Sequence, residues 1–396
     1  MSPSRAGDTE GPLTFREGWP AVLLMAGMVF LAAYSRLLIS PLLVTIAAEL
    51  EISFEAATDF FLPISGGFVL ALLLSGHVSS RLRHRGTIIF SGLLTAVALG
   101  LCALVASKEA FMVCLFLLGL GPGTYAGSGL PATSDLIRRE EVATAISVHE
   151  LGPAIGFVAA PITVAVLGPE LGRPGVLGIA AGVCLLFTLL YVLFGRGGEG
   201  RGTPLSFRTV RRYLGSTRFV LILVIFVLVA ACAFGVYSIL PGYLIVFHRF
   251  DPELVNTLVG VSRISGIAVL LLSGRLADRI GNRRIIAWSL GVTGALTVGL
   301  GALGGAPLLI VVFLQPFLVP AFFPAAFSQI ARLSDGASQN VALALVIAGA
   351  NLMGIGAFPR LAGSLQAAGV FNLAFVMLGG AALIATIAAW IAFRRW

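Results

Sequence analysis

Long apolar runs separated by short polar stretches extend along the whole chain. Twelve runs can be counted, and each has the length of about eighteen or more residues that an α-helix needs to cross a hydrocarbon core of about 30 Å. We number these runs segments 1 to 12, and they cover approximately residues 19–47, 57–78, 87–106, 111–135, 142–167, 174–194, 218–247, 254–273, 285–304, 308–331, 340–363 and 370–393. The pattern predicts an all-α integral membrane protein with twelve transmembrane helices.

The longest polar stretch lies between segments 6 and 7. It reads GRGGEGRGTPLSFRTVRRYLGSTR from Gly195, and it is rich in glycine and arginine. This stretch divides the chain into two halves of six segments each. We therefore predict a first bundle over 1–194, including a short polar tail over 1–18, a linker over 195–217 and a second bundle over 218–396.

The two halves are similar to each other in sequence. SGHVSSRLRHRGTIIF from Ser75 aligns with SGRLADRIGNRRIIAW from Ser273, and both lie between the second and third segments of their half. Further matches pair Pro122 and Tyr125 with Pro320 and Phe323, Gly156 and Pro161 with Gly354 and Pro359, and Tyr34, Ser35 and Pro41 with Tyr237, Ser238 and Pro241. The repeat predicts two pseudo-symmetric six-helix bundles, an arrangement that is typical of transporters in which two halves rock around a central site.

Composition supports a membrane protein. Hydrophobic residues make up 58% of the 396, charged residues only 11%, and the mean hydropathy is +1.00, whereas a soluble protein carries about 25% charged residues. Glycine occurs 48 times, and small residues let transmembrane helices approach closely. The four cysteines lie inside apolar segments without paired spacing, so we expect neither disulfides nor a metal site.

The distribution of basic residues predicts the orientation in the membrane. Most arginines fall in the N-terminal tail, the central linker, the C-terminus and the loops on that same side. The opposite side carries only Lys108, Arg173, Arg249 and Arg360. Basic loops face the cytoplasm, so we expect cytoplasmic termini in a multi-pass protein of a bacterial inner membrane. The net charge of +8 is explained by these loops, and we expect no nucleic-acid partner.

The loop GRLADRIGNRR, Gly274–Arg284, resembles the signature loop of the major facilitator superfamily. Together with the twelve segments and the repeat, the resemblance covers the whole chain. The first-half copy departs from it, with Ser80 where the family has aspartate. The resemblance implies a secondary transporter that works by alternating access, with segments 1, 4, 7 and 10 lining a central cavity and segments 2, 5, 8 and 11 between the halves. It also implies that segments 3, 6, 9 and 12 pack outside.

The resemblance gives the second-half loop a role in gating. Asp278, Arg279, Gly281 and Arg284 would then latch the cytoplasmic side, with Gly281 allowing a tight turn. The alternative is a basic loop that only sets topology. Gly152-Pro153-x-x-Gly156 in segment 5 resembles part of an antiporter motif, although these residues are also ordinary in membrane helices. The arginine that proton-coupled members carry in segment 4 is missing, because Leu115 stands near that position.

Three ionisable residues lie deep in apolar segments: Arg36 in segment 1, Arg263 in segment 8 and Glu150 in segment 5. Such residues are costly in a membrane and usually face a cavity or a partner. Several anion-transporting branches place a cation in segment 1 and an arginine in segment 8, so the arginines suggest a site for a carboxylate. The alternative is structural pairing of Arg36 with Asp59 and of Arg263 with Glu150, and the two interpretations can coexist.

Glu150 is the candidate proton carrier, because a carboxylate that alternates between burial and a cationic neighbour can load and release a proton. His149 could assist, although a packed interfacial histidine is the simpler interpretation. Asp59 is assigned to an outer gate. Helix register adds further polar candidates for the cavity wall: Tyr34, Ser40, Pro41, Tyr125, Tyr237, Tyr243, Gln315 and Asn351.

Nothing in the sequence resembles an enzyme site. No nucleotide-binding loop and no Cys/His ligand cluster is present, so we expect no cofactor and transport driven by gradients. The leading hypothesis is a monomeric, proton-coupled transporter of a small organic anion, working as a symporter or an antiporter, with substrate, protons and the lipid bilayer as its partners. The alternative is a proton-driven exporter of hydrophobic drugs or metabolites, and a third possibility is a non-transporting sensor.

Overall fold

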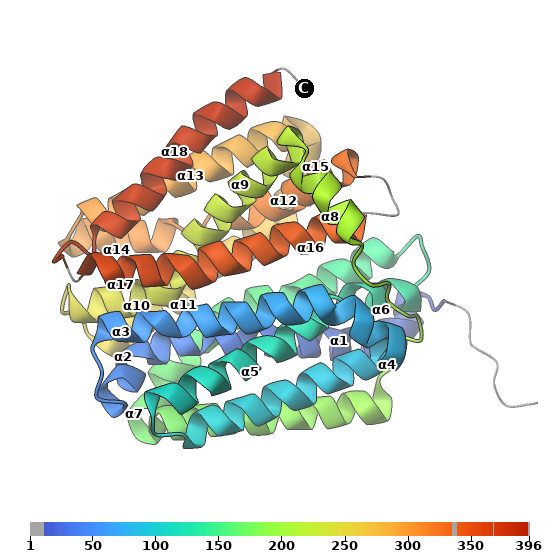
Figure 1. The fold of residues 1–396 in the computed structure, drawn as a ribbon, viewed down its shortest axis with the longest axis horizontal. Helices are drawn as coiled ribbons and strands as arrows, with labels where there is room; N and C mark the ends of the chain where they lie inside the picture. Colours follow the sequence, from blue (N-terminus) through green and yellow to red (C-terminus); the bar gives the residue numbers. More distant parts are fainter. Residues whose placement is uncertain (1–11, 335–338, 367, 395–396) are drawn as a thin grey trace, which may run out of the picture.

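The computed structural model describes residues 12–334, 339–366 and 368–394, apart from the side chains of residues 271, 273–278 and 394. In this part of the chain the regular structure is helical, with one isolated β-bridge between Leu13 and Ile137. Figure 1 shows long helices lying side by side in two groups, the earlier half of the chain below and the later half above.

The first bundle contains segments 1 to 6. Its helices are α1 (Phe15–Leu37), α2 (Ile39–Glu49), α3 (Phe54–Ala57), η1 (Thr58–Phe60), α4 (Phe61–Leu104), α5 (Lys108–Ala126), α6 (Gly129–Leu136) and α7 (Val142–Phe194). Segment 1 is formed by α1 and α2, and segment 4 by α5 and α6. The long helix α4 forms segments 2 and 3, and α7 forms segments 5 and 6.

The second bundle contains segments 7 to 12 and follows the short linker helix α8 (Phe207–Leu214). Its helices are α9 (Thr217–Ala230), η2 (Ala231–Gly235), α10 (Val236–Val246), α11 (Pro252–Ser262), α12 (Ile264–Ile280), α13 (Asn282–Ala302), α14 (Gly305–Leu314), α15 (Val319–Leu333), α16 (Gln339–Gly349), η4 (Ala350–Ala357), α17 (Phe358–Gln366) and α18 (Leu373–Arg394). Segments 9 and 12 are the single helices α13 and α18. The other four are built from two or three shorter helices.

Within the described residues, ten helical stretches are long and apolar enough to cross a membrane. Two of them, α4 and α7, contain one residue with non-helical torsions, Arg83 (φ 59°, ψ 171°) and Gly172 (φ 57°, ψ −169°). Each of these two therefore consists of two antiparallel crossings joined by a one-residue turn. The twelve transmembrane helices predicted from the sequence are confirmed.

The turn between segments 2 and 3 is shorter than the sequence predicted. We expected a polar loop over residues 79–86, but the helix continues to residue 82 and resumes at residue 84 around Arg83. Helices extend past the apolar core because long arginine side chains cover apolar surface while their charged ends reach water. Hydropathy marks the hydrocarbon boundary and therefore misses these polar helix ends.

The repeat seen in the sequence is also present in side-chain contacts. His84 Nδ1 lies 3.1 Å from Ser128 Oγ in the first half, and Asn282 Nδ2 donates to Ser328 Oγ at 2.8 Å in the second. One residue further on, Arg85 donates to the Val192 carbonyl at 3.0 Å and Arg283 to the Phe393 carbonyl at 2.9 Å. Each arginine thus satisfies a carbonyl near the end of the last helix of its own half.

The halves meet along segments 5 and 8 and along segments 2 and 11, as the family resemblance implies. Glycines allow this approach. A Cβ added to Gly260 in α11 would lie 2.8 Å from Ile162 in α7, and one added to Gly356 in η4 would lie 2.9 Å from Ser65 in α4. The halves are therefore closely packed both between α7 and α11 and between α4 and η4.

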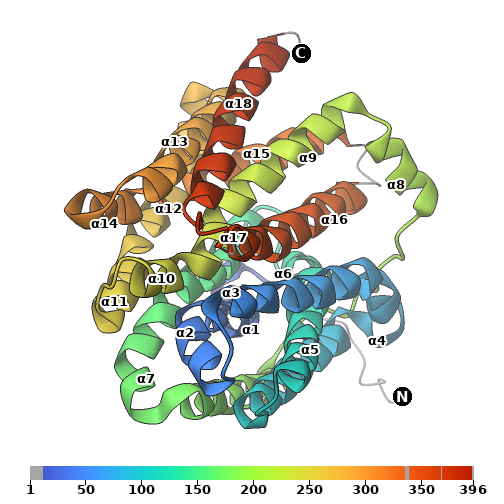
Figure 2. The same ribbon diagram turned by 60° about the vertical axis from the view of Figure 1, so that its left-hand side comes forward.

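The side that carries α8 and α6, on the right in Figure 1, is called here the linker side, and the opposite side the far side. On the far side the halves touch between α2, α3, α10 and α17, which Figure 2 brings forward. A Cβ on Gly242 would lie 2.0 Å from the Phe54 ring, and one on Gly363 would lie 2.2 Å from Thr58 Oγ1. Neither position leaves room for a larger residue.

The linker is packed against the first bundle before it reaches α8. The backbone amides of His84 and Arg85 donate to the carbonyls of Gly200 and Gly198 at 3.0 and 2.8 Å. Arg83 forms an ion pair with Glu199 at 2.6 Å. The linker thus covers the first-half copy of the signature loop.

Candidate functional site

Arg36 lies in the interior of the first bundle, near the end of α1. Its Nη1 donates to Asn351 Oδ1 in the second bundle at 3.0 Å, and its guanidinium lies 4.2 Å from the centre of the Phe68 ring. Its Nε is buried without a hydrogen-bond partner. Arg36 is therefore a charged group that joins the two halves and has a free donor inside the molecule.

Arg263 stands between α11 and α12 and is 8% exposed. Its guanidinium carbon lies 5.1 Å from the Tyr237 ring centre and 5.6 Å from the Phe157 ring centre. Its Nε also has no hydrogen-bond partner. Aromatic faces attract a desolvated cation by about 2 kcal/mol, but they accept no conventional hydrogen bond from it.

The surroundings of the two arginines are connected through segments 1 and 7. Pro41 has no N–H, so the carbonyl of Leu37 lacks its helical partner, and Tyr237 Oη donates to it at 3.4 Å. Pro241 leaves the carbonyl of Tyr237 without its partner in the same way, and Ser40 Oγ donates to it at 2.6 Å. The paired prolines of the repeat thus create two reciprocal bonds between the halves.

Two π-helical stretches, η2 and η4, face each other next to these bonds. A Cβ on Gly235 in η2 would lie 2.3 Å from the carbonyl of Gly354 in η4. Asn351, the partner of Arg36, belongs to η4 and also donates to the Ile347 carbonyl at 2.9 Å. Short π-helical insertions are frequent at functional sites, and no residue pattern in the sequence had indicated them.

The alternative pairing that the sequence left open is not found among the described residues. Asp59 Oδ1 lies 3.7 Å from Arg360 Nε on the far side, and Glu150 Oε1 lies 3.0 Å from His149 Nδ1. Neither Arg36 nor Arg263 forms an ion pair within the described part of the chain. Asp59 thus connects α17 with η1, at the place where the halves close the far side.

His149 is buried and bonded at both ring nitrogens. Its Nε2 lies 2.8 Å from Tyr125 Oη, and its Nδ1 lies 3.0 Å from Glu150 Oε1. The second contact joins sequence neighbours, even though adjacent side chains on a helix point about 100° apart. Tyr125 also reaches the Met25 carbonyl at 3.0 Å. The Tyr125 and His149 rings are stacked with centres 5.9 Å apart. Segments 1, 4 and 5 meet at this group.

The other candidates for the cavity wall divide into two kinds. Tyr34 donates to Thr163 Oγ1 at 2.9 Å, which joins segment 1 to segment 5. Gln315 donates to the Cys232 carbonyl at 2.6 Å and Tyr243 to the Leu300 carbonyl at 3.1 Å, so both bind inside the second bundle. Gln315 Oε1 is buried without a partner, which leaves it one acceptor for another molecule.

The predicted latch is only partly within the described residues. The side chain of Asp278 lies outside them, while Arg279 and Arg284 are exposed on the linker side. Gly281 has φ 89° and ψ 140°, so the tight turn predicted there is confirmed. The gating role itself stays a prediction.

Gly152, from the partial motif of segment 5, contacts segment 1. A Cβ at Gly152 would lie 2.6 Å from the carbonyl of Ala26. The glycine therefore permits close packing of α7 on α1, which is the ordinary role of small residues between membrane helices.

An aromatic stack beside Arg263 was missed in the sequence. Phe157 stacks on Phe234 at 5.3 Å, and Phe234 stacks on Phe323 at 5.6 Å, so the stack runs from segment 5 through segment 7 to segment 10. Glu150 and Phe157 are seven residues apart, so both lie on one face of the helix. This spacing was the sequence signal that could have placed Phe157 near the interior of the molecule. The stack gives Arg263 an apolar surrounding.

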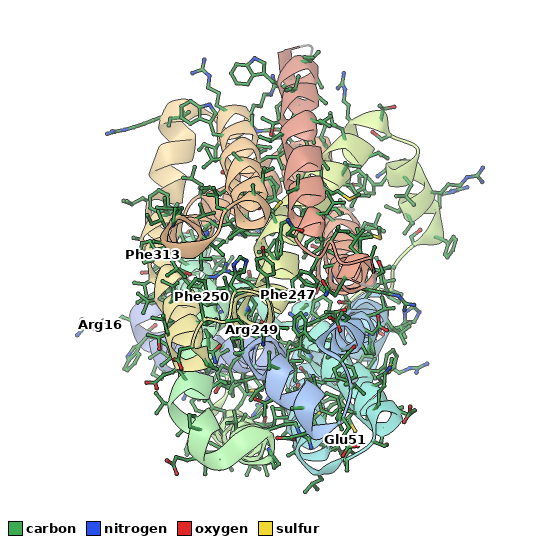
Figure 3. All side chains as sticks on the ribbon, turned by 90° about the vertical axis from the view of Figure 1, so that its left-hand side faces the viewer. Arg16, Glu51, Phe247, Arg249, Phe250 and Phe313 are labelled. Atoms are coloured by element: carbon green, nitrogen blue, oxygen red, sulfur yellow. The ribbon has the colours of Figure 1, made fainter. Side chains whose placement is uncertain are left out.

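The turn between α10 and α11 carries Phe247, Arg249 and Phe250, which lie together on the far side in Figure 3. A cavity of about 420 Å³ lies beside this turn, with Tyr243, His248, Phe371 and Asn372 among its lining residues. Burial lowers the pKa of His248 below its ordinary value. Among the described residues no group of His, Cys, Asp and Glu could hold a metal ion.

Comparison with solved structures places this fold among transporters. The nucleoside transporter NupG matches with a TM-score of 0.79 at 15% identity, covering 94% of this chain and 100% of that one. A D-xylose–proton symporter matches with a TM-score of 0.79 at 13% identity, covering 94% and 97%. A bacterial homolog of the human lysosomal transporter Spinster, in an inward-facing and occupied conformation, matches with a TM-score of 0.77 at 14% identity, covering 98% of each chain.

A sequence comparison with curated proteins gives no match. The family model described as Major Facilitator Superfamily matches residues 25–306 and 248–395, which together include nearly the whole chain. The match agrees with the twelve crossings and with the repeated turns at Arg83 and Gly281. The chain belongs to the Major Facilitator Superfamily, whose members are membrane transporters and not enzymes.

Proposed function

We propose that this protein is a secondary transporter that carries a small organic anion across the membrane by alternating access, coupled to protons. The observation that carries the proposal is the pair of interior arginines, one from each half. Both have an unpartnered Nε, and neither has an acidic partner among the described residues.

An interior cation without a counter-ion is costly, because its desolvation is not repaid by a partner. The guanidinium of Arg263 is held by aromatic rings, which leave its donors free for an anion. A carboxylate would supply the missing charge and accept hydrogen bonds from the planar fork. This supports a carboxylate, bound between the halves, as the substrate class.

The contacts between the halves suggest how such a site would open. Arg36–Asn351 and Ser40–Tyr237 both cross from the first bundle to the second. If the bundles rock apart on the far side, these bonds must break, and a bound anion would compensate for the loss at Arg36. Substrate binding would then favour the change between the two poses.

The remaining features of the proposal follow from charge and fold. The arginine-rich linker side is expected to face the cytoplasm of a bacterial cell, with the protein acting as a monomer. Proton coupling is supported by the bonded group of Tyr125, His149 and Glu150. Asp59, which lies near Arg360, is assigned to the far-side gate.

A second candidate function is proton-driven export of hydrophobic compounds. The stack of Phe157, Phe234 and Phe323 favours it, because aromatic faces bind flat apolar molecules. In that case the arginines would be structural, and transport would not depend on them.

One experiment separates the two functions. A thermal-shift screen of purified protein against carboxylates such as succinate and lactate would select a probe for counterflow in liposomes. Benzenesulfonate, an anion without a carboxylate, is the control in this screen. Loss of a buried charge pair costs about 2–5 kcal/mol, so Arg263→Ala should reduce carboxylate counterflow at least about 30-fold. The control Arg208→Ala removes an exposed linker arginine and should change little. Carboxylate counterflow that is unchanged in Arg263→Ala would reject the anion site. Efflux of a hydrophobic dye that is equal in the unaltered protein and in Arg263→Ala would instead support the export function.

A further inference from the structure

Tyr125, His149 and Glu150 form a chain of hydrogen bonds from a buried phenol to an exposed carboxylate. Tyr125 and His149 are 3% and 2% exposed, whereas the Glu150 side chain is 44% exposed. The contacts measure 2.8 Å from Tyr125 Oη to His149 Nε2 and 3.0 Å from His149 Nδ1 to Glu150 Oε1. The imidazole is thus enclosed, but its carboxylate partner is accessible.

The phenol has one proton and two acceptors within reach. Tyr125 Oη lies 2.8 Å from His149 Nε2 and 3.0 Å from the Met25 carbonyl. If the hydroxyl donates to Nε2, the histidine is neutral and its proton sits on Nδ1, facing the carboxylate. If the hydroxyl donates to Met25, its oxygen accepts a proton from Nε2, and the histidine can then carry protons on both nitrogens.

We infer that His149 is a proton-binding site that is loaded and unloaded by rotation of the Tyr125 hydroxyl between His149 and the Met25 carbonyl. In the unloaded state Nδ1–H donates to Glu150 and Tyr125 O–H donates to Nε2. Loading takes one proton from solution, which ends on Nε2, while the hydroxyl turns to Met25. The two end states share the same heavy-atom contacts, and every donor keeps an acceptor in both. The inference rests on the proton-coupled transport proposed above and identifies its proton carrier.

The charge of the His149–Glu150 pair changes with loading. The unloaded pair has a net charge of −1, and the loaded pair is neutral. Helix α7, which carries both residues, packs against α1 with Arg36 and against α11 next to Arg263. A neutral pair no longer repels an anion that binds at these arginines, so loading favours substrate binding.

Other ionisable residues lie on α7 and on the helices that pack against it. On α7 itself the other ionisable residues are Glu170, Arg173, Cys184 and Tyr191. Among the described side chains, the trio forms hydrogen bonds among its own members and with the Met25 carbonyl. The remaining ionisable residues on helices packed against α7 are Arg16, Glu17, Tyr34 and Arg36 on α1, Glu49 on α2, His77, Arg81, Arg83, His84 and Arg85 on α4, Asp135 on α6, Glu253 on α11, and Arg275, Asp278 and Arg279 on α12.

Nitrogen-15 NMR of the histidine side chains tests this inference without a substrate. The chain has four histidines, and a His149→Gln variant assigns the resonance of His149 by difference. We expect the neutral ring to carry its proton on Nδ1, facing Glu150, and the added proton to appear on Nε2 as the sample is acidified. An Nε2–H neutral tautomer, or a ring that takes up no second proton on acidification, would overturn the assignment.

The role of the hydroxyl is tested by Tyr125→Phe, which removes the partner that Nε2 has among the described residues. The imidazolium fraction at about pH 6 should fall at least about fivefold, because an unpaired buried donor disfavours the charged form. Unchanged spectra of His77, His84 and His248 would show that the variant is folded. An unaltered His149 titration in that folded variant would exclude the hydroxyl switch.

Transport separates this inference from the proposed function. Counterflow of radiolabelled succinate measures substrate exchange, whereas accumulation driven by an inward pH gradient also requires a coupled proton, at about tenfold per pH unit for one proton. We expect His149→Gln to reduce accumulation about tenfold more than counterflow. If the unaltered protein shows counterflow without pH-driven accumulation, the inference of a proton site at His149 is rejected, while transport of an organic anion is not. If no carboxylate gives counterflow, the proposed function fails, whatever the NMR titration shows.

Discussion

At the scale of single residues, the interior of this protein is organised around polar groups that cross between helices. Arg36 reaches Asn351 from the opposite half, and Ser40 reaches the backbone of Tyr237. The first of these bonds joins two side chains, whereas the second uses the backbone carbonyl that Pro241 leaves without a helical partner. These residues explain why so few polar side chains suffice to connect two large apolar bundles.

Asn351 provides the first test at this scale. Asn351→Ala leaves Nη1 of Arg36 without its acceptor, and an unpaired charged group costs about 1–3 kcal/mol or more. We expect a lower melting temperature in detergent and partial recovery when a transported carboxylate is added. Asn340→Ala, at an exposed position of α16, is the matched control and should melt like the unaltered protein. Equal stability of both variants would mean that Arg36 does not depend on Asn351.

His248 predicts a pH dependence of stability outside the membrane-spanning segments. Burial lowers its pKa below the ordinary value of 6.5, so below that pH the unfolded chain binds a proton more readily than the folded protein does. Stability should therefore fall as the pH drops through 6.5 and stay level above it. His248→Gln should remove part of this acid sensitivity in thermal unfolding at about pH 5. His77→Gln, at an exposed site, should not, and an identical response of both would refute the assignment.

At the scale of helices, the repeat is most visible in its turns. Arg83 in the first half occupies the position of Gly281 in the second, and both have positive φ. Glycine adopts such torsions freely, whereas for other residues the region near φ 59° and ψ 171° costs about 1–3 kcal/mol. The first-half turn is held by the linker, which bonds to His84 and Arg85.

Arg83→Gly should relieve this strain. The variant also loses the exposed ion pair with Glu199, which is worth about 0–1 kcal/mol, so Glu199→Gln serves to measure that loss separately. After this correction we expect Arg83→Gly to raise the stability of the protein by about 1 kcal/mol in thermal unfolding. A corrected loss of stability would show that Arg83 is not strained.

The elements could be predicted from sequence to different degrees. Hydropathy located all twelve segments because each must match the thickness of the membrane, and Gly281 marked its turn. The π-helical stretches η2 and η4 have no such signature, since they depend on glycines from two distant segments meeting at Gly235 and Gly354. Likewise, hydropathy placed Arg36 and Arg263 in the interior, but the rotation of each helix decides their neighbours. Asp59 therefore lies beside Arg360 and Glu150 beside His149, which spacing along the chain did not reveal.

At the scale of the whole molecule, the far side is closed by contacts between the bundles. Side chains of the first bundle pack directly against glycines of the second. Phe54 packs against Gly242, and Thr58 packs against Gly363. Such contacts are close but need no strong bonds, and they can separate when the bundles rock. The weak ion pair of Asp59 and Arg360 lies at the same place.

A steric substitution tests whether this closure takes part in transport. A Cβ at Gly363 would lie 2.8 Å from the carbonyl oxygen of Glu55 and 2.2 Å from Thr58 Oγ1, so Gly363→Ala should hold the halves apart on the far side. Overpacking costs about 1–3 kcal/mol, and we expect counterflow to fall at least about fivefold. Gly380→Ala, where nothing lies within 4 Å of an added Cβ, is the matched control and should transport like the unaltered protein. Unchanged counterflow in Gly363→Ala would show that the far side need not close.

The most direct test of the central claim is the binding of a carboxylate to the two interior arginines. Equilibrium binding of the radiolabelled carboxylate selected by counterflow should weaken at least about 30-fold in Arg36→Ala and in Arg263→Ala, the equivalent of about 2 kcal/mol. Arg208→Ala should bind as the unaltered protein does. If the two interior variants retain the affinity of the unaltered protein, the anion site between the halves is contradicted.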